Sequence, residues 1–390
     1  MAKYEIIDGV AILPEGIEMI KDFAFMDCTE LKRVVIPQGV RRIGNFAFYG
    51  CKNLEVVELP ELLEVIGKSA FRGCSSLKEL TLPQWVKRIE KWAFHDCSSL
   101  QNLSIPSSVT HIGDSAFWGC SSLQNLSIPS FVTHIGYCAF LGCSSLQKLS
   151  IPSSVTHIGR SAFWNCSSLQ NLSIPSSVTH IGDKACAGCS SLIRIKVDSN
   201  NPVYDSREDS NAIIHTESNT LIRGCSNTII PPSVTSIGEC AFHCCKSLTR
   251  ISIPPSVTSI GNGTFRGCTS LTHISIPPSV TSIGGWAFSG CTSLSQISIP
   301  PSVTSIEGNT FRCCTSLTQI SLPPSVTSIK DRAFLACSSL THISIPPSVT
   351  LIGWEAFRGC TSLTLVKVSK NTELEEDAFW DCPNVKIERY

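Results

Sequence analysis

The stretch SSLTHISIPPSVTLIGWEAFRGCT, residues 338–361, decides the fold because the chain repeats it. A near copy, TSLTHISIPPSVTSIGGWAFSGCT, occupies residues 269–292, and more divergent copies fill most of the 390 residues. A fixed period of this kind is the sequence signature of a solenoid, in which every copy forms one coil. The cysteine near the end of the copy recurs every 23 residues in two series, Cys28, Cys51, Cys74, Cys97, Cys120, Cys143, Cys166 and Cys189, then Cys245, Cys268, Cys291, Cys314, Cys337 and Cys360, and Cys382 follows one residue early.

Each copy predicts a coil that buries one side of a short strand. Ile274 and Ile276 alternate with polar residues, which is the two-residue period of a half-buried strand. The prolines that follow end the strand, since proline cannot donate a ladder hydrogen bond. Further apolar positions then point inward from a second side, and the segment AFxxC returns the chain as a short turn or 3-10 segment. The residue before the ladder cysteine is Gly, Asp or Asn in most copies, so we expect left-handed backbone there.

The period is interrupted once. Cys189 and Cys245 are 56 residues apart, ten more than two periods. Residues 203–204, 212–214 and 220–222 read as short strands separated by polar turns, which predicts a β-hairpin or small meander. We therefore expect one solenoid over residues 1–390, with an N-terminal array at 1–197, a hairpin insertion at 198–224, and a C-terminal array with its cap at 225–390. The insertion is either a tolerated bulge, which we favour, or a binding or hinge element.

The repeat LxxIxIPxSVTxIGxxAFxxC resembles the BspA-like class of leucine-rich repeats. The segment NPVYDSREDSNAIIHTESNTLI, residues 201–222, resembles a hairpin element of that class. The resemblance covers the chain from about Val10 to Cys382. It implies a right-handed, curved, mostly β solenoid with one parallel sheet. It also implies adhesion or protein binding, often at the surfaces of bacteria and unicellular eukaryotes, and it brings no catalytic motif.

Composition and motifs exclude several functions. With 31 basic and 31 acidic residues the chain has no net charge, whereas nucleic-acid binding leaves a basic footprint. No apolar run approaches the ~18–20 residues of a membrane span. G-x-S-x-G, P-loop and H-E-x-x-H motifs are absent from the sequence, so we expect neither an enzyme nor a cofactor. The N-terminus lacks the apolar core of a signal peptide, which favours the cytoplasm; the cell surface is the alternative that the resemblance implies.

The 21 cysteines admit three interpretations: small buried packing residues, disulfides between neighbouring coils, or metal ligands. We expect packing, because a residue that every coil repeats serves the coil. The pair Cys186 and Cys189 matches C-x-x-C but has no second pair at hand, so we expect no metal there. So many thiols also favour a reducing compartment.

Two further columns lie on the surface. A row of imidazoles could bind metal or sense pH, because neighbouring positive charges oppose protonation. Metal ligands normally converge, however, so we expect a copied surface column without a metal. The threonine column suggests ice or crystal-surface binding, which we regard as a remote alternative. The histidines are His111, His134, His157 and His180, and the threonines are Thr110, Thr133, Thr156, Thr179, Thr258, Thr281, Thr304 and Thr327.

The outward side of the strands forms a broad, polar, nearly uncharged strip. Solenoids bind partners on such extended concave surfaces, so we expect this strip to bind a protein partner. The alternative is a structural or self-associating rod, because uncovered strand edges at the two ends favour end-to-end pairing. The expected binding residues are Asn102, Asn125, Lys148, Asn171, Arg194, Arg250, His273, Gln296, Gln319 and His342.

Overall fold

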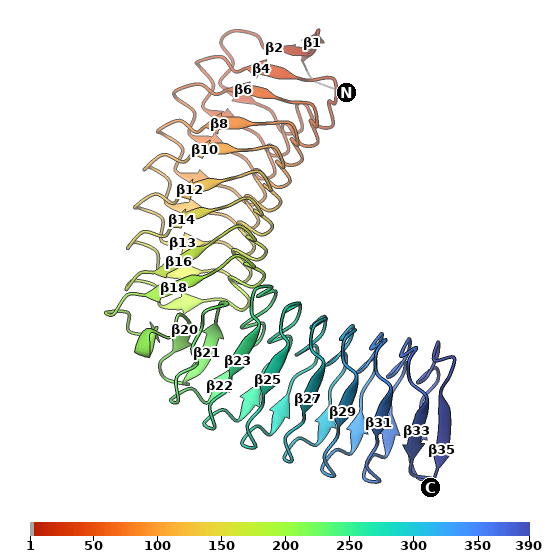
Figure 1. Cartoon of the computed structure of the whole chain (residues 1–390). Coiled ribbons are helices and arrows are strands. Elements are labelled where there is room, and N and C mark those ends of the chain that lie inside the picture. The colour runs from red at the N-terminus through yellow and green to blue at the C-terminus, as the bar shows by residue number, and fades with distance from the viewer. Residues whose placement is uncertain (1–3) are drawn as a thin grey trace. The chain divides into compact units, whose positions relative to one another are not determined.

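The computed structural model describes residues 4–390 as stacked coils of short strands, and these residues contain no α-helix (Figure 1). The predicted mostly β solenoid is therefore confirmed. The coils form two compact units. The first unit comprises Met1–Leu192 and Val197–Val203, and the second comprises Ile193–Lys196 and Tyr204–Tyr390.

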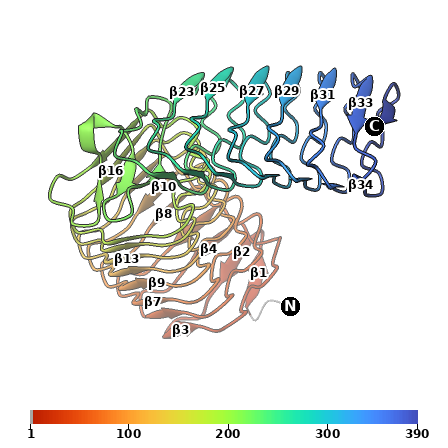
Figure 2. The same cartoon turned by 90° about the horizontal axis from the view of Figure 1, so that it is seen from below.

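Each coil contributes one long strand of three or four residues. Most neighbouring long strands pair in parallel and in register, so that Leu80 lies beside Leu103 and Ile320 beside Ile343. Figure 2 shows those of the second unit from residue 250 onward standing in one row. In the first unit the long strands are β4 (Arg33–Val35), β6 (Val56–Glu58), β8 (Glu79–Thr81), β10 (Asn102–Ser104), β12 (Asn125–Ser127), β14 (Lys148–Ser150) and β16 (Asn171–Ile174). In the second unit they are β18 (Arg194–Val197, its last residue excepted), β23 (Arg250–Ser252), β25 (His273–Ser275), β27 (Gln296–Ser298), β29 (Gln319–Ser321), β31 (His342–Ser344), β33 (Leu365–Val368) and β35 (Lys386–Arg389).

A second column of two-residue strands lies where the sequence predicted only inward-pointing side chains. The prediction of one parallel sheet is therefore incomplete, because a two-residue strand is too short to show an alternating pattern. The short strands of the first unit are β3 (Met19–Ile20), β5 (Arg42–Ile43), β7 (Val65–Ile66), β9 (Arg88–Ile89), β11 (His111–Ile112), β13 (His134–Ile135), β15 (His157–Ile158) and β17 (His180–Ile181). Those of the second unit are β22 (Ser236–Ile237), β24 (Ser259–Ile260), β26 (Ser282–Ile283), β28 (Ser305–Ile306), β30 (Ser328–Ile329), β32 (Leu351–Ile352) and β34 (Glu373–Leu374).

The first unit begins with an antiparallel pair, β1 (Glu5–Ile7) and β2 (Val10–Ile12). Strand β2 then pairs in parallel with β4, so the pair starts the sheet of long strands. This arrangement covers the edge of β4, which would otherwise present unpaired backbone groups. In the second unit β35 pairs with β33 as the last long strand.

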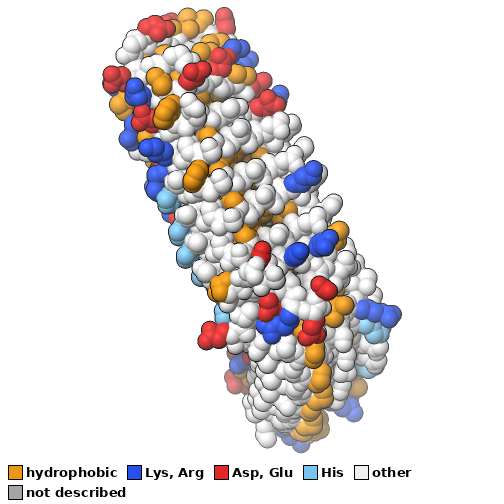
Figure 3. Space-filling model, turned by 90° about the vertical axis from the view of Figure 1, so that its left-hand side faces the viewer, with side chains coloured by type: hydrophobic (Ala, Val, Ile, Leu, Met, Phe, Trp, Pro, Cys, Tyr) orange, Lys and Arg blue, Asp and Glu red, His pale blue; other side chains and the backbone are white. Residues whose placement is uncertain are grey.

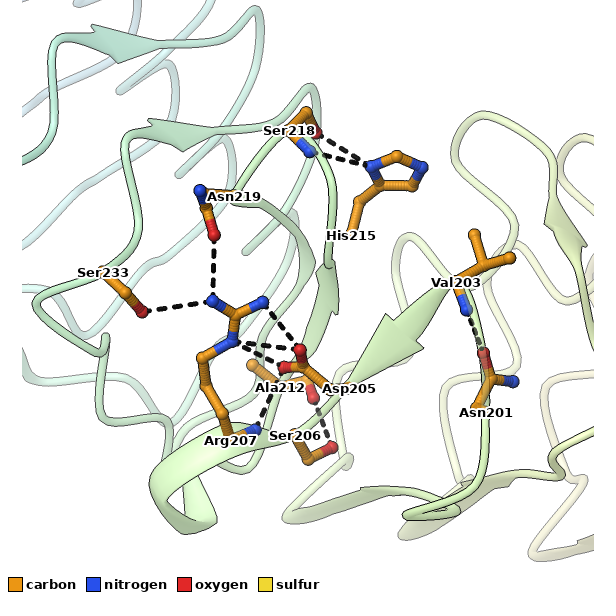
Figure 4. A network of polar contacts seen from close by, with 10 residues as sticks. All are labelled: Asn201, Val203, Asp205, Ser206, Arg207, Ala212, His215, Ser218, Asn219 and Ser233. Atoms are coloured by element: carbon orange, nitrogen blue, oxygen red, sulfur yellow. Dashed lines mark hydrogen bonds and ion pairs between the residues drawn. The ribbon is translucent and has the colours of Figure 1, made fainter.

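The insertion is a three-stranded meander followed by the second array. Strands β19 (Tyr204–Asp205), β20 (Ile213–His215) and β21 (Thr220–Arg223) pair antiparallel in order, and a 3-10 turn, η1 (Arg207–Asp209), joins the first two. The Arg207 guanidinium fixes this turn by donating to the Asp205 carboxylate at 2.6–3.0 Å and to Asn219 Oδ1 at 2.9 Å (Figure 4). Strand β21 then pairs in parallel with β22, so the meander is continuous with the second array.

The core consists of columns that run through the coils. The ladder phenylalanines stack almost parallel, with ring centroids 5.1 Å apart for Phe48 and Phe71 and 5.5 Å apart for Phe288 and Phe311. The ladder cysteines are buried, which confirms the packing interpretation. They also donate hydrogen bonds, which the sequence did not predict: Cys74 Sγ lies 3.1 Å from the Phe48 carbonyl of the preceding coil. The same bond recurs in most coils, so each thiol fills space and adds a second hydrogen bond to a carbonyl that a backbone N–H also reaches, as Cys51 N reaches Phe48 at 3.3 Å.

The predicted left-handed residue before the ladder cysteine is confirmed. Gly73 has φ +77° and Asp96 has φ +59°, and the column keeps this conformation where it carries Cys244 or Ala336. A second left-handed column, which the sequence did not reveal, lies four residues earlier and includes Trp92 and Trp286. These two positions turn the chain without a helix, because each reverses the backbone within one residue.

Candidate functional site

The ten residues predicted to bind a partner all lie at the first position of a long strand, and all are exposed. Their side chains point away from the core because the middle residue of each strand points inward. We call the outward side chains at the first and third positions of the long strands the strand face. Asn102, Asn125, Lys148 and Asn171 lie in the first unit, and Arg194, Arg250, His273, Gln296, Gln319 and His342 in the second.

The strand face of the second unit is hollowed over β25, β27, β29 and β31. The hollow has a volume of about 570 Å³. Its lining brings together four predicted residues, His273, Gln296, Gln319 and His342, of which the last three succeed one another in register. The third strand positions add a row of exposed hydroxyls, which the prediction left out of the binding residues: Ser275, Ser298, Ser321 and Ser344.

In the part of the chain that the structure describes, the glutamine side chains in this hollow, unlike the threonine hydroxyls beside the strands, form no hydrogen bond with a neighbouring coil. The Thr318 hydroxyl, one residue before the strand, donates to the Ser295 carbonyl of the preceding coil at 3.2 Å. By contrast, within residues 4–390 the Gln296 and Gln319 side chains form no hydrogen bond. Their amides can therefore donate to and accept from a partner, which needs both kinds of group.

A second hollow lies on the strand face of the first unit, over β4, β6 and β8. It measures about 710 Å³ and is lined by apolar residues, including Val35, and by Glu58, Glu61 and Glu79. Arg33 pairs with Glu58 at 2.5 Å, and Asn102 donates to Glu79 at 3.1 Å. None of these acidic residues was among the predicted binding residues.

The histidine column lies on short strands β11, β13, β15 and β17. The rings of His134 and His157 stack with centroids 4.5 Å apart, and those of His111 and His134 lie 6.2 Å apart. Partial burial lowers the pKa of His134, and the neighbouring His157 and His111 lower it further. Within residues 4–390, no three His, Cys, Asp or Glu side chains gather as a metal site would require.

Threonine hydroxyls in the column beside the histidines are used within the fold. Thr156 Oγ1 lies 3.2 Å from the Thr133 carbonyl and 2.8 Å from Nδ1 of His157. In the second unit Thr281 donates to the Thr258 carbonyl at 3.2 Å. These hydroxyls therefore have partners within the fold, either a carbonyl of the preceding coil or the adjacent histidine ring.

Burial makes the ladder thiols poor nucleophiles. It raises the pKa of Cys51 to about 12 and that of Cys245 to about 11. Since the thiolate is the reactive form, such cysteines are inert at neutral pH. All 21 cysteines are thiols in the structure, and all but Cys244 and Cys313 are buried.

Sequence reasoning missed three exposed apolar residues at one repeat position of the first unit. Leu62, Trp85 and Phe131 are 43%, 50% and 63% exposed. Most other copies carry serine there, as at Ser108 and Ser154. The departure from the repeat template was the signal that could have found them. Figure 3 shows one face of the molecule, where orange hydrophobic side chains stand as separate patches in the upper part and as a continuous row at the lower end, with pale-blue histidines mostly along the left edge.

In-register parallel strands and a buried leucine in nearly every coil, such as Leu77 and Leu340, define a leucine-rich-repeat solenoid. The family model "BspA type Leucine rich repeat region (6 copies)" matches residues 10–124, 87–207, 204–286 and 259–386. The chain belongs to this family, as its repeat predicted. No curated protein matches it.

Solved structures agree with this assignment. A leucine rich cell surface protein from Faecalibacterium prausnitzii A2-165 is 30% identical, with a TM-score of 0.62, over 90% of this chain and 83% of that one. The pneumococcal vaccine antigen PcpA is 21% identical, with a TM-score of 0.64, over 97% and 88% of the two chains. A leucine-rich repeat protein from Eubacterium ventriosum ATCC 27560 is 23% identical, with a TM-score of 0.58, over 90% of each chain. The last two similarities show the fold alone. Within residues 4–390 no helix is long and apolar enough to span a membrane.

Proposed function

We propose that the chain is a non-catalytic binding or adhesion protein and that its strand face holds a protein partner. The observation that carries the proposal is the hollow over β25–β31, whose Gln296 and Gln319 amides the fold leaves unused. Coil-building hydroxyls, such as that of Thr318, are bonded to the preceding coil. A row of unbonded donors and acceptors on a rigid scaffold suits recognition of a polar protein surface.

A location at the cell surface is part of this proposal. The relative from Faecalibacterium prausnitzii is a cell surface protein and shares 30% of its residues with this chain. The cytoplasmic location that we expected from the N-terminus and the thiols receives no support from these comparisons. The ladder cysteines can exist as thiols outside the cell as well, because buried thiols are protected from exchange.

A charge added to the hollow tests the proposal. Gln296→Glu with Gln319→Glu keeps the shape of both side chains but places two carboxylates side by side, since the two residues are register partners. We expect the immobilised variant to lose partners that the unmodified protein captures from a surface-protein extract. Asn262→Asp with Lys330→Gln changes the net charge equally on exposed turns outside the hollow and should keep them. If both variants captured the same partners, the strand face would not be the binding surface, and the structural-rod alternative would be favoured.

A further inference from the structure

One position of the repeat carries serine in most coils, but in the first unit it carries glycine at Gly16 and Gly39 and a large apolar residue in three further coils. At this position serine normally donates to a valine carbonyl of the preceding coil: Ser108 to Val86, Ser154 to Val132 and Ser177 to Val155, each at 2.7 Å. The second unit repeats the bond, for example from Ser279 to Val257 at 2.7 Å. The serine therefore stabilises the stacking of the coils.

Leu62, Trp85 and Phe131 replace this serine. We call Trp85 and Phe131 the aromatic strip, and Leu62 extends the apolar row by one coil. An apolar side chain cannot donate the hydrogen bond, and each of the three exposes about half of its surface or more to water. Both changes are unfavourable for the coil itself. The strip is therefore explained by an interaction outside the coil rather than by packing within it.

The solenoid sets the spacing of the strip. Leu62 and Trp85 belong to neighbouring coils, and Phe131 lies two coils beyond Trp85 with Ser108 between them. Across those two steps the core rings of Phe94, Phe117 and Phe140 repeat at 5.4 and 5.2 Å. Trp85 and Phe131 are thus displayed on the order of 10 Å apart along one line, as two steps of a parallel ladder.

Polar groups flank the strip. A hollow of about 450 Å³ beside Trp85 is lined by Glu64, Val65, Lys87, Arg88 and Glu90. Arg88 and Glu90 pair at 3.3 Å, and Glu64 pairs with Arg41 of the preceding coil at 2.8 Å. The site therefore combines an exposed aromatic face with donors and acceptors of both charges at its edge, as ligand sites typically do.

We propose that the aromatic strip binds an extended, unbranched glycan with β-1,4 linkages. Sugar rings present apolar C–H faces that stack on aromatic rings, while their equatorial hydroxyls need the polar groups beside Trp85. One pyranose unit is about as long as one coil step of the ladder. In a β-1,4 chain successive rings are flipped, so the same face recurs at every second sugar, which matches two rings two coils apart. A protein hot spot would instead form one contiguous packed patch.

Calorimetric titration of the full chain with cellohexaose and with chitohexaose tests the proposal. We expect at least one of the two to bind, and Trp85→Ser and Phe131→Ser each to weaken that binding by about tenfold. Both variants restore the common serine of the repeat, so they should melt no lower than the unmodified protein, which excludes misfolding as the cause of the loss. Tyr137→Ser removes another exposed aromatic ring of the first unit, at a different position of the repeat, and should leave binding unchanged.

The outcomes separate the possibilities. Binding that depends on both rings supports the glycan site. If neither oligosaccharide binds, or if binding survives in the Trp85→Ser, Phe131→Ser double variant, the proposal is overturned. The glutamate variants of the β25–β31 hollow should bind the oligosaccharide normally, so this result is independent of the function proposed for the strand face.

Discussion

At the scale of single residues, the left-handed position before the ladder cysteine shows why the repeat prefers glycine. An L-residue in this conformation costs about 1–2 kcal/mol, because its Cβ approaches the following carbonyl oxygen. Most copies avoid the cost with glycine, as at Gly73, or reduce it with Asp or Asn. Ala336 has φ +58°, and its methyl side chain does nothing to offset this cost.

Gly73 and Ala336 occupy the same repeat position, so exchanging their residue types gives a matched pair of substitutions. A Cβ added at Gly73 would lie 3.6 Å from its nearest neighbour, the Gly50 Cα, so it would meet ordinary contact rather than a clash. Gly73→Ala should therefore destabilise the protein by about 1 kcal/mol through backbone strain alone, and Ala336→Gly should stabilise it by a similar amount. Urea unfolding measures both. Two changes of the same sign would show that strain at this position does not control stability.

The sequence predicted these columns well because each one repeats a single physical requirement. Period, burial and the left-handed glycine follow from residues that every coil needs. The S–H bond from Cys74 to the Phe48 carbonyl was missed, because a buried cysteine reads as a small hydrophobic residue whether or not it donates. The left-handed column that includes Trp92 was also missed, since its residue types carry no turn signal.

At the scale of elements, the meander supplies hydrogen-bond donors to the first regular coil that follows it. In regular coils backbone N–H groups donate to the next coil, as from Phe25 to the Ala47 carbonyl at 2.7 Å. The first coil of the second array has no such coil before it. Gly224 N donates to the Ala241 carbonyl at 2.9 Å, and the buried Arg223 guanidinium reaches the Ala241 and His243 carbonyls at 3.2 and 3.4 Å.

We therefore predict that Arg223 caps the second array. Arg223→Met keeps the length of the side chain but removes the donor that reaches the His243 carbonyl, while the Ala241 carbonyl keeps Gly224 N; this loss should destabilise the second unit by about 1–3 kcal/mol. Hydrogen exchange of residues 236–268 should accelerate. Arg250→Met, at an exposed position on β23, is the control and should change stability by less than about 0.5 kcal/mol. Equal effects of the two variants would contradict the capping role.

The histidine column should make the stability of the first unit depend on pH below neutrality. The pKa of His134 is lowered in the folded state, so the unfolded chain takes up the proton first as the pH falls through about 6.5. Stability should therefore decrease between about pH 7.5 and pH 5. His157→Ser removes a neighbouring charge at a position where the second unit carries serine, and it should reduce this loss. Thermal unfolding at the two pH values measures both. An equal loss in the variant would show that repulsion within the column is unimportant.

At this scale the sequence predicted the long strands and those of the meander, but not the contacts between them. The three strands of the meander were predicted from their apolar residues and polar turns. The role of Arg223 was not, because it depends on which carbonyls the preceding segment leaves uncovered. Likewise, the binding residues were assigned by strand position alone. The sequence could not show that His273, Gln296, Gln319 and His342 share a hollow, because a hollow depends on how neighbouring coils splay.

At the scale of the whole molecule, the thiols couple stability to alkaline pH. Burial raises the pKa of ladder cysteines above the ordinary value of 9.0, to about 12 for Cys51 and about 11 for Cys245. Above about pH 9 the unfolded chain loses thiol protons that the folded chain keeps, so the unfolded state is favoured increasingly until the folded thiols also ionise. Each such thiol contributes about 1.4 kcal/mol per pH unit, and many act together. The solenoid should therefore lose stability steeply as the pH rises above 9 in the presence of reductant.

One substitution isolates this effect. Cys120 is fully buried, its pKa is raised well above 9.0 by burial, and its Sγ lies 3.2 Å from the Phe94 carbonyl. Cys120→Ala should destabilise the protein at pH 7 by about 2 kcal/mol, because it leaves a small cavity and removes one of the two hydrogen bonds that the Phe94 carbonyl accepts, the other coming from Cys97 N. Above pH 9 the variant lacks one ionisable thiol, so its deficit should shrink by about 1.4 kcal/mol per pH unit. Urea unfolding of both proteins at pH 7, 8, 9 and 9.5 measures the difference. A deficit that stays constant across this range would show that the ladder thiols do not control alkaline stability.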